Sequence, residues 1–250
     1  MKIKMIVTDL DRTLLRTDVS ISDDTAGVLN RCRNSGIKVA FATARYMRQA
    51  KDFTLKIPMD AVIAINGAII YVDDEIVIEH TIPENTKHRI IRDLNTAGIK
   101  IAAEAANVVY TNRHTPDDDR IIWDFANEVP IAIHRISIRH NDTEQVMRIA
   151  KKYDDLCVYS NSGETLLDIG QAEADKSKGV YELSKLFGIP MSEIAAFGDD
   201  FNDIGMLKEC GIGVAVANAC AEAKLAADYV CGSNDEDGVA RWLEKNVIFD

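Results

Sequence analysis

Short apolar runs and longer stretches with helical spacing alternate at both ends of the chain. The short runs are apolar on both faces, which is typical of buried parallel strands. Two of the helical stretches stop at Gly36 and Gly188, the residue type that most often follows a helix. This alternation predicts a parallel sheet with helices on both faces. The predicted strands are 3–8, 37–42, 61–65, 194–197, 212–216 and 229–231, with a hairpin over 68–72 and 76–79; the predicted helices are 22–34, 45–56, 179–187, 204–209, 219–227 and 238–245.

The middle of the chain, roughly from Ile82 to Ala174, has a different order of elements. Runs with strand character follow one another there, which predicts an antiparallel sheet with helices on one face. The fold class is therefore α/β: a doubly wound, Rossmann-like parallel-sheet core interrupted by an inserted α+β domain. We place the core at residues 1–81 and 176–250 and the insert at 82–175. Its predicted elements are helix 84–97, strands 99–104 and 107–112, a helix that begins at Thr115, strand 133–139, helix 143–153, and strands 156–160 and 165–169.

Charge and cysteine content narrow the choice of partner and compartment. The chain has 29 Lys and Arg against 40 Asp and Glu, a net charge of −11, which disfavours nucleic acid and anionic membranes as partners. Its five cysteines are odd in number and form no CxxC pair, which is typical of reduced thiols in the cytoplasm. The first residues carry only a short apolar run, so we expect neither a signal peptide nor a membrane span there.

Polar residues gather where three predicted core strands end. The first strand ends in Asp9-Leu10-Asp11-Arg12-Thr13, the second in Thr43-Ala44-Arg45, and a later one in Gly198-Asp199-Asp200-Phe201-Asn202-Asp203. Ligands of open α/β sheets bind beyond the carboxyl ends of the strands. Each segment alone could be a helix cap or a polar turn. Together they crowd carboxylates at one rim, which calls for a cation such as Mg²⁺, whose preferred ligands are hard oxygens.

These segments, in this order and with Lys178-Gly179 between them, resemble the motifs of the haloacid dehalogenase superfamily. The position of the insert resembles members with a type 2 cap. The closing segments 217–219 and 237–240 resemble the Cof-type phosphatases of that superfamily. Two residues depart from the usual pattern, because Arg12 and Ala44 stand where glycine is common. At Arg12 this requires either a negative φ or a strained backbone.

The resemblance implies a role for each matching residue. Asp9 would be the nucleophile and Asp11 the general acid and base. Lys178 would supply positive charge to the phosphate and to Asp9. Lys176 is the competing candidate, but the Ser-Lys-Gly context and the predicted helix start favour Lys178. The implied phosphate-binding residues are Leu10, Thr43, Ala44, Lys178 and Asn202. Arg45 and Asp203 would touch the substrate or support the site. The implied ligands of Mg²⁺ are Asp9, Asp11 (through its main-chain carbonyl) and Asp199.

The expected function is a magnesium-dependent phosphatase that hydrolyses small phosphorylated metabolites, such as sugar phosphates, through an aspartyl-phosphate intermediate. The insert would act as the cap that selects the substrate. Two alternatives share the acidic pair: a phosphoryl-transfer mutase, which returns phosphate to a sugar, and a receiver-like signalling module phosphorylated on aspartate. Phosphomannomutases have Gly-Gly-Asn-Asp and an insertion where this chain has 198–203. Receiver domains carry the phosphorylated aspartate after a later strand and lack a large inserted domain.

Overall fold

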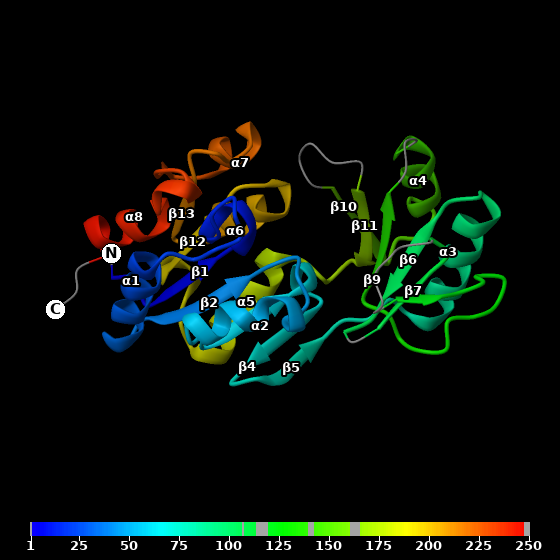
Figure 1. The fold of residues 1–250 in the computed structure, drawn as a ribbon, viewed down its shortest axis with the longest axis horizontal. Coiled ribbons are helices and arrows are strands. Elements are labelled where there is room, and N and C mark those ends of the chain that lie inside the picture. Colours follow the sequence, from blue (N-terminus) through cyan, green and yellow to red (C-terminus); the bar gives the residue numbers. More distant parts are fainter. Residues whose placement is uncertain (1, 107, 114–119, 140–142, 161–165, 248–250) are drawn as a thin grey trace. The chain divides into compact units, whose positions relative to one another are not determined.

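The computed structural model describes residues 2–106, 108–113, 120–139, 143–160 and 166–247 (Figure 1). The chain divides into two compact units, one of Met1–Ile78 with Asp175–Asp250 and one of Glu79–Ala174. The insert expected from the sequence, residues 82–175, begins three residues later and ends one residue later than the second unit of the structure. Each unit has its own sheet and its own apolar core.

An eight-stranded sheet forms the centre of the first unit, in the order β14-β13-β12-β1-β2-β3-β4-β5. The strands from β14 to β3 pair in parallel, and β4 joins β3 in the antiparallel direction. The predicted α/β class is confirmed. The strands are β1 (Met5–Thr8), β2 (Lys38–Ala42), β3 (Ala61–Ala64), β4 (Ile69–Val72), β5 (Glu75–Glu79), β12 (Ile194–Gly198), β13 (Ile212–Ala215) and β14 (Tyr229–Val230).

Helices cover both faces of this sheet. Val180 of α5 and Met206 of α6 pack in one cluster with Val7 and Ala42. On the other face, Phe197 of β12 meets Trp242 of α8 edge to face, with ring centroids 5.4 Å apart. The helices are α1 (Asp23–Asn34), α2 (Met47–Lys56), α5 (Lys176–Phe187), α6 (Ile204–Glu209), α7 (Ala221–Ala226) and α8 (Gly238–Asn246).

The register of the central strands decides where their polar ends meet. Thr8 of β1 pairs with Phe41 of β2 on one side and with Phe197 of β12 on the other. The residues that follow these strands therefore come out at the same rim of the sheet. The chain runs outward from β1 to β2 and later returns to place β12 on the opposite side of β1, so this rim is a topological switch point.

The second unit is built on a six-stranded sheet in the order β10-β11-β9-β6-β7-β8, with α3 (Glu84–Thr96) and α4 (Thr143–Ala150). Ile90 and Val146 of these helices pack on Ile101, Ile136 and Ile169 of the strands. Among the alternate strand residues, which face the other way, are the polar side chains Glu104, Arg135, Ser137 and Asp168. The strands are β6 (Ile101–Glu104), β7 (Val109–Thr111), β8 (Arg120–Ile122), β9 (Arg135–Arg139), β10 (Leu156–Ser160) and β11 (Leu166–Gln171).

One element of the second unit differs from the sequence-based expectation. The predicted helix start, residues 115–119, lies outside the described residues. The chain that follows forms the strand β8, which pairs in parallel with β7, and the described segment 120–139 contains no α-helix. The adjacent β-branched residues Ile121 and Ile122 favour an extended backbone. The prediction of a helix that continues past residue 119 was wrong.

None of the helices within the described ranges combines the length and the apolar character needed to cross a bilayer.

Candidate active site

The loop after β1 brings Asp9 to the rim of the core sheet. The Asp9 side chain is buried, and its backbone N–H donates to the carbonyl of Phe197 at 2.9 Å, which extends the β1–β12 pairing by one residue. Arg12 turns the chain with a φ of 60°, the left-handed conformation that glycine adopts most easily. Asn218 Nδ2 donates to the Arg12 carbonyl at 2.7 Å and holds this turn. The backbone therefore keeps a positive φ at Arg12 and accepts the strain.

A buried ammonium group lies between two carboxylates at the centre of the site. Lys176 Nζ is 2.7 Å from Asp9 Oδ1 and 2.7 Å from Asp203 Oδ1, and its side chain is 1% exposed. Lys178, the residue expected to supply this charge, is exposed at the surface of α5. The structure assigns the contact with Asp9 to Lys176 and corrects the choice of Lys178.

The start of α5 explains this correction. The helix begins three residues before the predicted start at 179, with Asp175 as its N-cap. The Asp175 carboxylate accepts from the backbone N–H groups of Ser177 at 2.8 Å and Lys178 at 3.4 Å. Lys176 is then the first helical residue and faces the sheet rim. Asp175 could have indicated this earlier helix start, because aspartate is among the preferred N-cap residues.

Asp203 positions the lysine and the loop at the same time. Its Oδ2 accepts from the backbone N–H groups of Asp199 at 2.9 Å and Asp200 at 3.1 Å, while its Oδ1 faces Lys176. The side chain is fully buried. Gly198 makes room for it, because a Cβ on that glycine would lie 2.4 Å from the Asp203 Cβ. Asp203 therefore holds Lys176 and the backbone of residues 199–200 together.

Asp199 is buried beside this pair. Thr13 Oγ1 donates to Asp199 Oδ1 at 2.9 Å. Burial raises the pKa of Asp199 to about 7, and the charge of Asp203 acts in the same direction, while the Thr13 hydrogen bond and Lys176 oppose the shift. Thr13 was not among the predicted site residues, although it belongs to the same motif as Asp9.

The charges of the site do not balance. Asp9, Asp199 and Asp203 each offer a carboxylate oxygen, and these oxygens lie within 4.8 Å of one another. Burial raises the pKa of Asp9 well above its usual value; Lys176 opposes this, and Asp203 and Asp199 add to it. Burial alone would lower the pKa of Lys176, but the two aspartates outweigh it and keep the ammonium charged. Inside the buried cluster three carboxylates face one ammonium, and in their ionised form they leave two negative charges, which the half-exposed Arg12 guanidinium at 3.9 Å from Asp199 offsets only in part. A divalent cation would neutralise them, and an all-oxygen donor set fits Mg²⁺.

This cluster differs in one member from the expected ligand set of Asp9, Asp11 and Asp199. The side chain of Asp203 belongs to it, whereas the Asp11 carboxylate is 47% exposed and is held by Arg45. Arg45 Nε donates to Asp11 Oδ2 at 2.7 Å, and its Nη2 donates to Oδ1. The ligand expected from Asp11 is its main-chain carbonyl, and that role stays a prediction. Arg45 acts as the residue that positions Asp11.

The remaining predicted phosphate-binding residues lie on neighbouring loops of the same unit. Thr43 is fully buried, and its Oγ1 accepts from the backbone N–H of Arg45 at 3.1 Å, so its own proton is left to donate elsewhere. Asn202 Nδ2 donates to Asn66 Oδ1 at 3.0 Å. Leu10 and Ala44 are the residues directly after Asp9 and Thr43, and their expected contribution is a backbone N–H each.

Asn66 is a site neighbour that the sequence did not single out. It is 2% exposed and has a φ of 54°, a conformation that asparagine tolerates better than most residues. The next residue, Gly67, approaches α5 so closely that a Cβ would lie 2.4 Å from the Asp175 carbonyl oxygen. The Asn-Gly pair was a turn signal, but its contact with Asn202 depends on the tertiary fold.

Comparison with known proteins supports this assignment. The profile of the haloacid dehalogenase-like hydrolase family matches residues 6–243. The chain is 27% identical over 248 residues to 5-amino-6-(5-phospho-D-ribitylamino)uracil phosphatase YcsE of Bacillus subtilis, which covers 98% of this chain and 96% of the relative. It is 25% identical to pyridoxal phosphate phosphatase YbhA of Escherichia coli, with 99% and 100% covered.

A solved structure has the same architecture. The structure of BT1666 from Bacteroides thetaiotaomicron, described among phosphatases of this superfamily, aligns with a TM-score of 0.88 at 26% identity. The alignment covers 98% of this chain and 95% of that one. Because the family match runs through both segments of the core and the unit inserted between them, the chain belongs to the haloacid dehalogenase-like hydrolases and is a phosphatase.

Proposed function

We propose that this phosphatase is magnesium-dependent and hydrolyses small phosphorylated metabolites through a phosphoryl group carried on Asp9. The observation that carries the proposal is the buried cluster of Asp9, Asp199 and Asp203 around Lys176, with its two excess negative charges. Attack on a phosphate ester requires a positioned nucleophile and neutralisation of charge. The cluster would supply the positioned nucleophile and, with a bound cation, the neutralisation of charge.

Asp9 is the proposed attacking group. Its Oδ1 is engaged by Lys176, so the carboxylate is held in one orientation and its other oxygen remains for phosphorus. The carboxylate of Asp9 forms the new bond to phosphorus as the bond to the leaving alkoxide breaks. A water molecule then releases phosphate and restores Asp9. Mg²⁺ held by Asp9, Asp199 and the main-chain carbonyl of Asp11 would supply the charge that lets a carboxylate approach a phosphate dianion.

Asp11 is the proposed proton donor to the leaving group and the later acceptor of a proton from water. Both of its oxygens are engaged by Arg45 in the structure. Asp11 must therefore release at least one of these hydrogen bonds during the reaction. Thr43 and Asn202 are proposed to donate to phosphate oxygens, together with the backbone N–H groups of Leu10 and Ala44 at the start of each loop.

The proposed substrates are small polar phosphate monoesters, including sugar phosphates. The relatives' names refer to a phosphorylated ribitylaminouracil and to pyridoxal phosphate, both of which carry polar groups beside the phosphate. We assign the choice among such esters to the inserted domain, residues 82–175. Its polar sheet face supports this: Arg135 donates to Glu104 at 2.7 Å and to Asp168 at 3.2 Å, and Ser137 donates to Asp168 at 2.6 Å.

Phosphate release from a panel of phosphorylated metabolites tests the proposed function. We expect turnover with Mg²⁺, and a fall of at least about a thousandfold in Asp9→Asn, which keeps the shape but removes the nucleophile. Circular dichroism controls for folding of the variant. A folded Asp9→Asn enzyme with near-normal turnover contradicts the mechanism, and isomerised sugar phosphate without phosphate release indicates a mutase.

The two lysines at the start of α5 provide a matched pair. Lys176→Met leaves Asp9 and Asp203 without their cation, and we expect kcat to fall by roughly two to three orders of magnitude. Lys178→Met removes the same charge two residues away and should change kcat by less than about twofold. Because a broken buried ion pair can cost about 3–5 kcal/mol, Lys176→Arg, which keeps the charge, serves as the folded comparison. Equal losses in both methionine variants would overturn the assignment to Lys176.

Metal removal provides a separate test. EDTA should abolish turnover and Mg²⁺ should restore it, because the excess carboxylate charge of the cluster repels a phosphate ester. Ca²⁺ should inhibit, since its larger and more variable coordination shell does not keep the in-line geometry. The measurement is initial rate against free metal concentration. Full activity in chelated enzyme rules out the proposed metal dependence.

The raised pKa of Asp199 predicts a pH dependence for the stability of the metal-free protein. Asp199 has a pKa of about 7 when folded, against about 3.9 in an unfolded chain. As pH rises between these values the unfolded state loses its proton first, so stability is lost through this window and stays lower above it. Asp199→Asn should therefore raise the free energy of unfolding by at least about 1 kcal/mol at pH 8 and change it little at pH 4. Urea unfolding in EDTA measures the free energy of unfolding of both proteins at each pH. An equal effect of Asp199→Asn at pH 8 and pH 4 contradicts the raised pKa of Asp199.

A further inference from the structure

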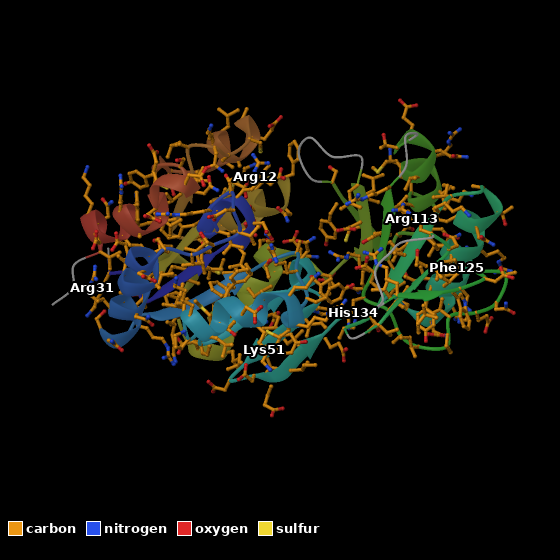
Figure 2. All side chains as sticks on the ribbon, in the orientation of Figure 1. Arg12, Arg31, Lys51, Arg113, Phe125 and His134 are labelled. Atoms are coloured by element: carbon orange, nitrogen blue, oxygen red, sulfur yellow. The ribbon has the colours of Figure 1, made fainter. Side chains whose placement is uncertain are left out.

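Arg12 is a charged residue at the site that the proposed reaction does not use. It lies on the loop that follows β1, where Figure 2 labels it. Its Nε is 3.9 Å from Asp199 Oδ2, and its side chain is 58% exposed. The other oxygen of the same carboxylate accepts from Thr13. The guanidinium therefore occupies the outer side of a carboxylate whose inner side is already engaged.

The backbone keeps Arg12 in this place although its conformation is unfavourable. A φ of 60° is costly for a residue with a Cβ. Two asparagines hold the loop: Asn218 donates to the Arg12 carbonyl, and Asn234 Nδ2 donates to the Leu15 carbonyl at 2.9 Å. Asn218 Oδ1 in turn accepts from the backbone N–H of Asn234 at 3.0 Å. The Arg12 backbone is thus held by hydrogen bonds, while its side chain is half-exposed.

We propose that Arg12 is a tethered counter-ion of Asp199 that competes with the divalent cation and lowers the metal affinity of the site. This inference rests on the proposed metal site. Asp199 Oδ1 already accepts from Thr13, so Oδ2, the oxygen that faces the guanidinium, is the one that would hold a cation. Two like-signed groups at this oxygen would repel one another. Metal binding then requires the Arg12 side chain to swing outward, which its exposure permits. Arg12 is a positioning residue here, because it acts through Asp199.

The test measures metal binding and needs no substrate. Isothermal titration of Mg²⁺ into chelator-treated full-length protein should give a dissociation constant about three to ten times lower in Arg12→Gln than in the natural protein. Arg12→Lys, which keeps the charge, should stay within about twofold. Lys4→Gln is the control for loss of one charge, since Lys4 pairs with Glu193 at 2.8 Å. Raising the salt concentration to 0.5 M should shrink the Arg12→Gln effect, because half-exposed charges are screened.

Arg12→Gly separates the backbone contribution from the charge. It should tighten Mg²⁺ binding as Arg12→Gln does, and it alone should also raise the melting temperature, because glycine relieves the positive φ. If Arg12→Gln binds Mg²⁺ with unchanged or weaker affinity, the proposal is wrong while the metal site stands. If the natural protein binds no Mg²⁺, or Asp199→Asn binds it equally well, the metal site itself fails.

Discussion

The ion cluster around Lys176 is the interaction on which the rest of the site depends. One ammonium touches the proposed nucleophile and a fully buried acid, and it does so from the first residue of a helix. A cation at a helix N-terminus opposes the helix dipole, so the position is unfavourable unless anions lie in front of it. Asp9 and Asp203 are those anions, and in turn a buried carboxylate without this lysine would resist ionisation. The aspartates stabilise the charge of Lys176, and Lys176 stabilises the charges of the aspartates.

Bringing these groups together requires close backbone approaches that few residue types allow. Gly198 leaves space for Asp203, and Gly67 lets the loop after β3 touch the start of α5. Ile65, Asn66 and Gly67 all have positive φ values, as does Arg12 on the facing loop. A β-branched residue such as Ile65 is rarely found there. Strained backbone near the site is tolerated because the surrounding hydrogen bonds over-determine it, as the contacts of Asn218 and Asn202 illustrate.

How far the sequence predicts this structure depends on how local each signal is. The core strands could be predicted because their apolar runs are short and bounded by turn residues, and the order of motifs placed Asp9, Thr43 and Asp199 at one rim. The helix expected after residue 119 failed because residues 120–122 pair in parallel with β7, eleven positions earlier, and the capping signal at Thr115 carries no information about that pairing. The choice between Lys176 and Lys178 turned on a single N-cap, and helix boundaries are the least certain part of a sequence-based assignment.

Asp11 and Arg45 show a further limit of motif-based reasoning. The motif places a carboxylate two residues after the nucleophile, but only the fold shows that a guanidinium from the loop after β2 holds both of its oxygens. The Arg45 guanidinium also lies 5.3 Å from the centre of the Phe53 ring in α2, a second contact that orients it. A proton carrier that must act twice, first as donor and then as acceptor, needs an orientation that is defined yet reversible. A half-exposed bidentate pair meets both needs, because water can replace either hydrogen bond at low cost. The buried Lys176 cluster and the half-exposed Asp11–Arg45 pair therefore suit different roles: the first holds fixed charge, and the second leaves the proposed proton carrier able to move.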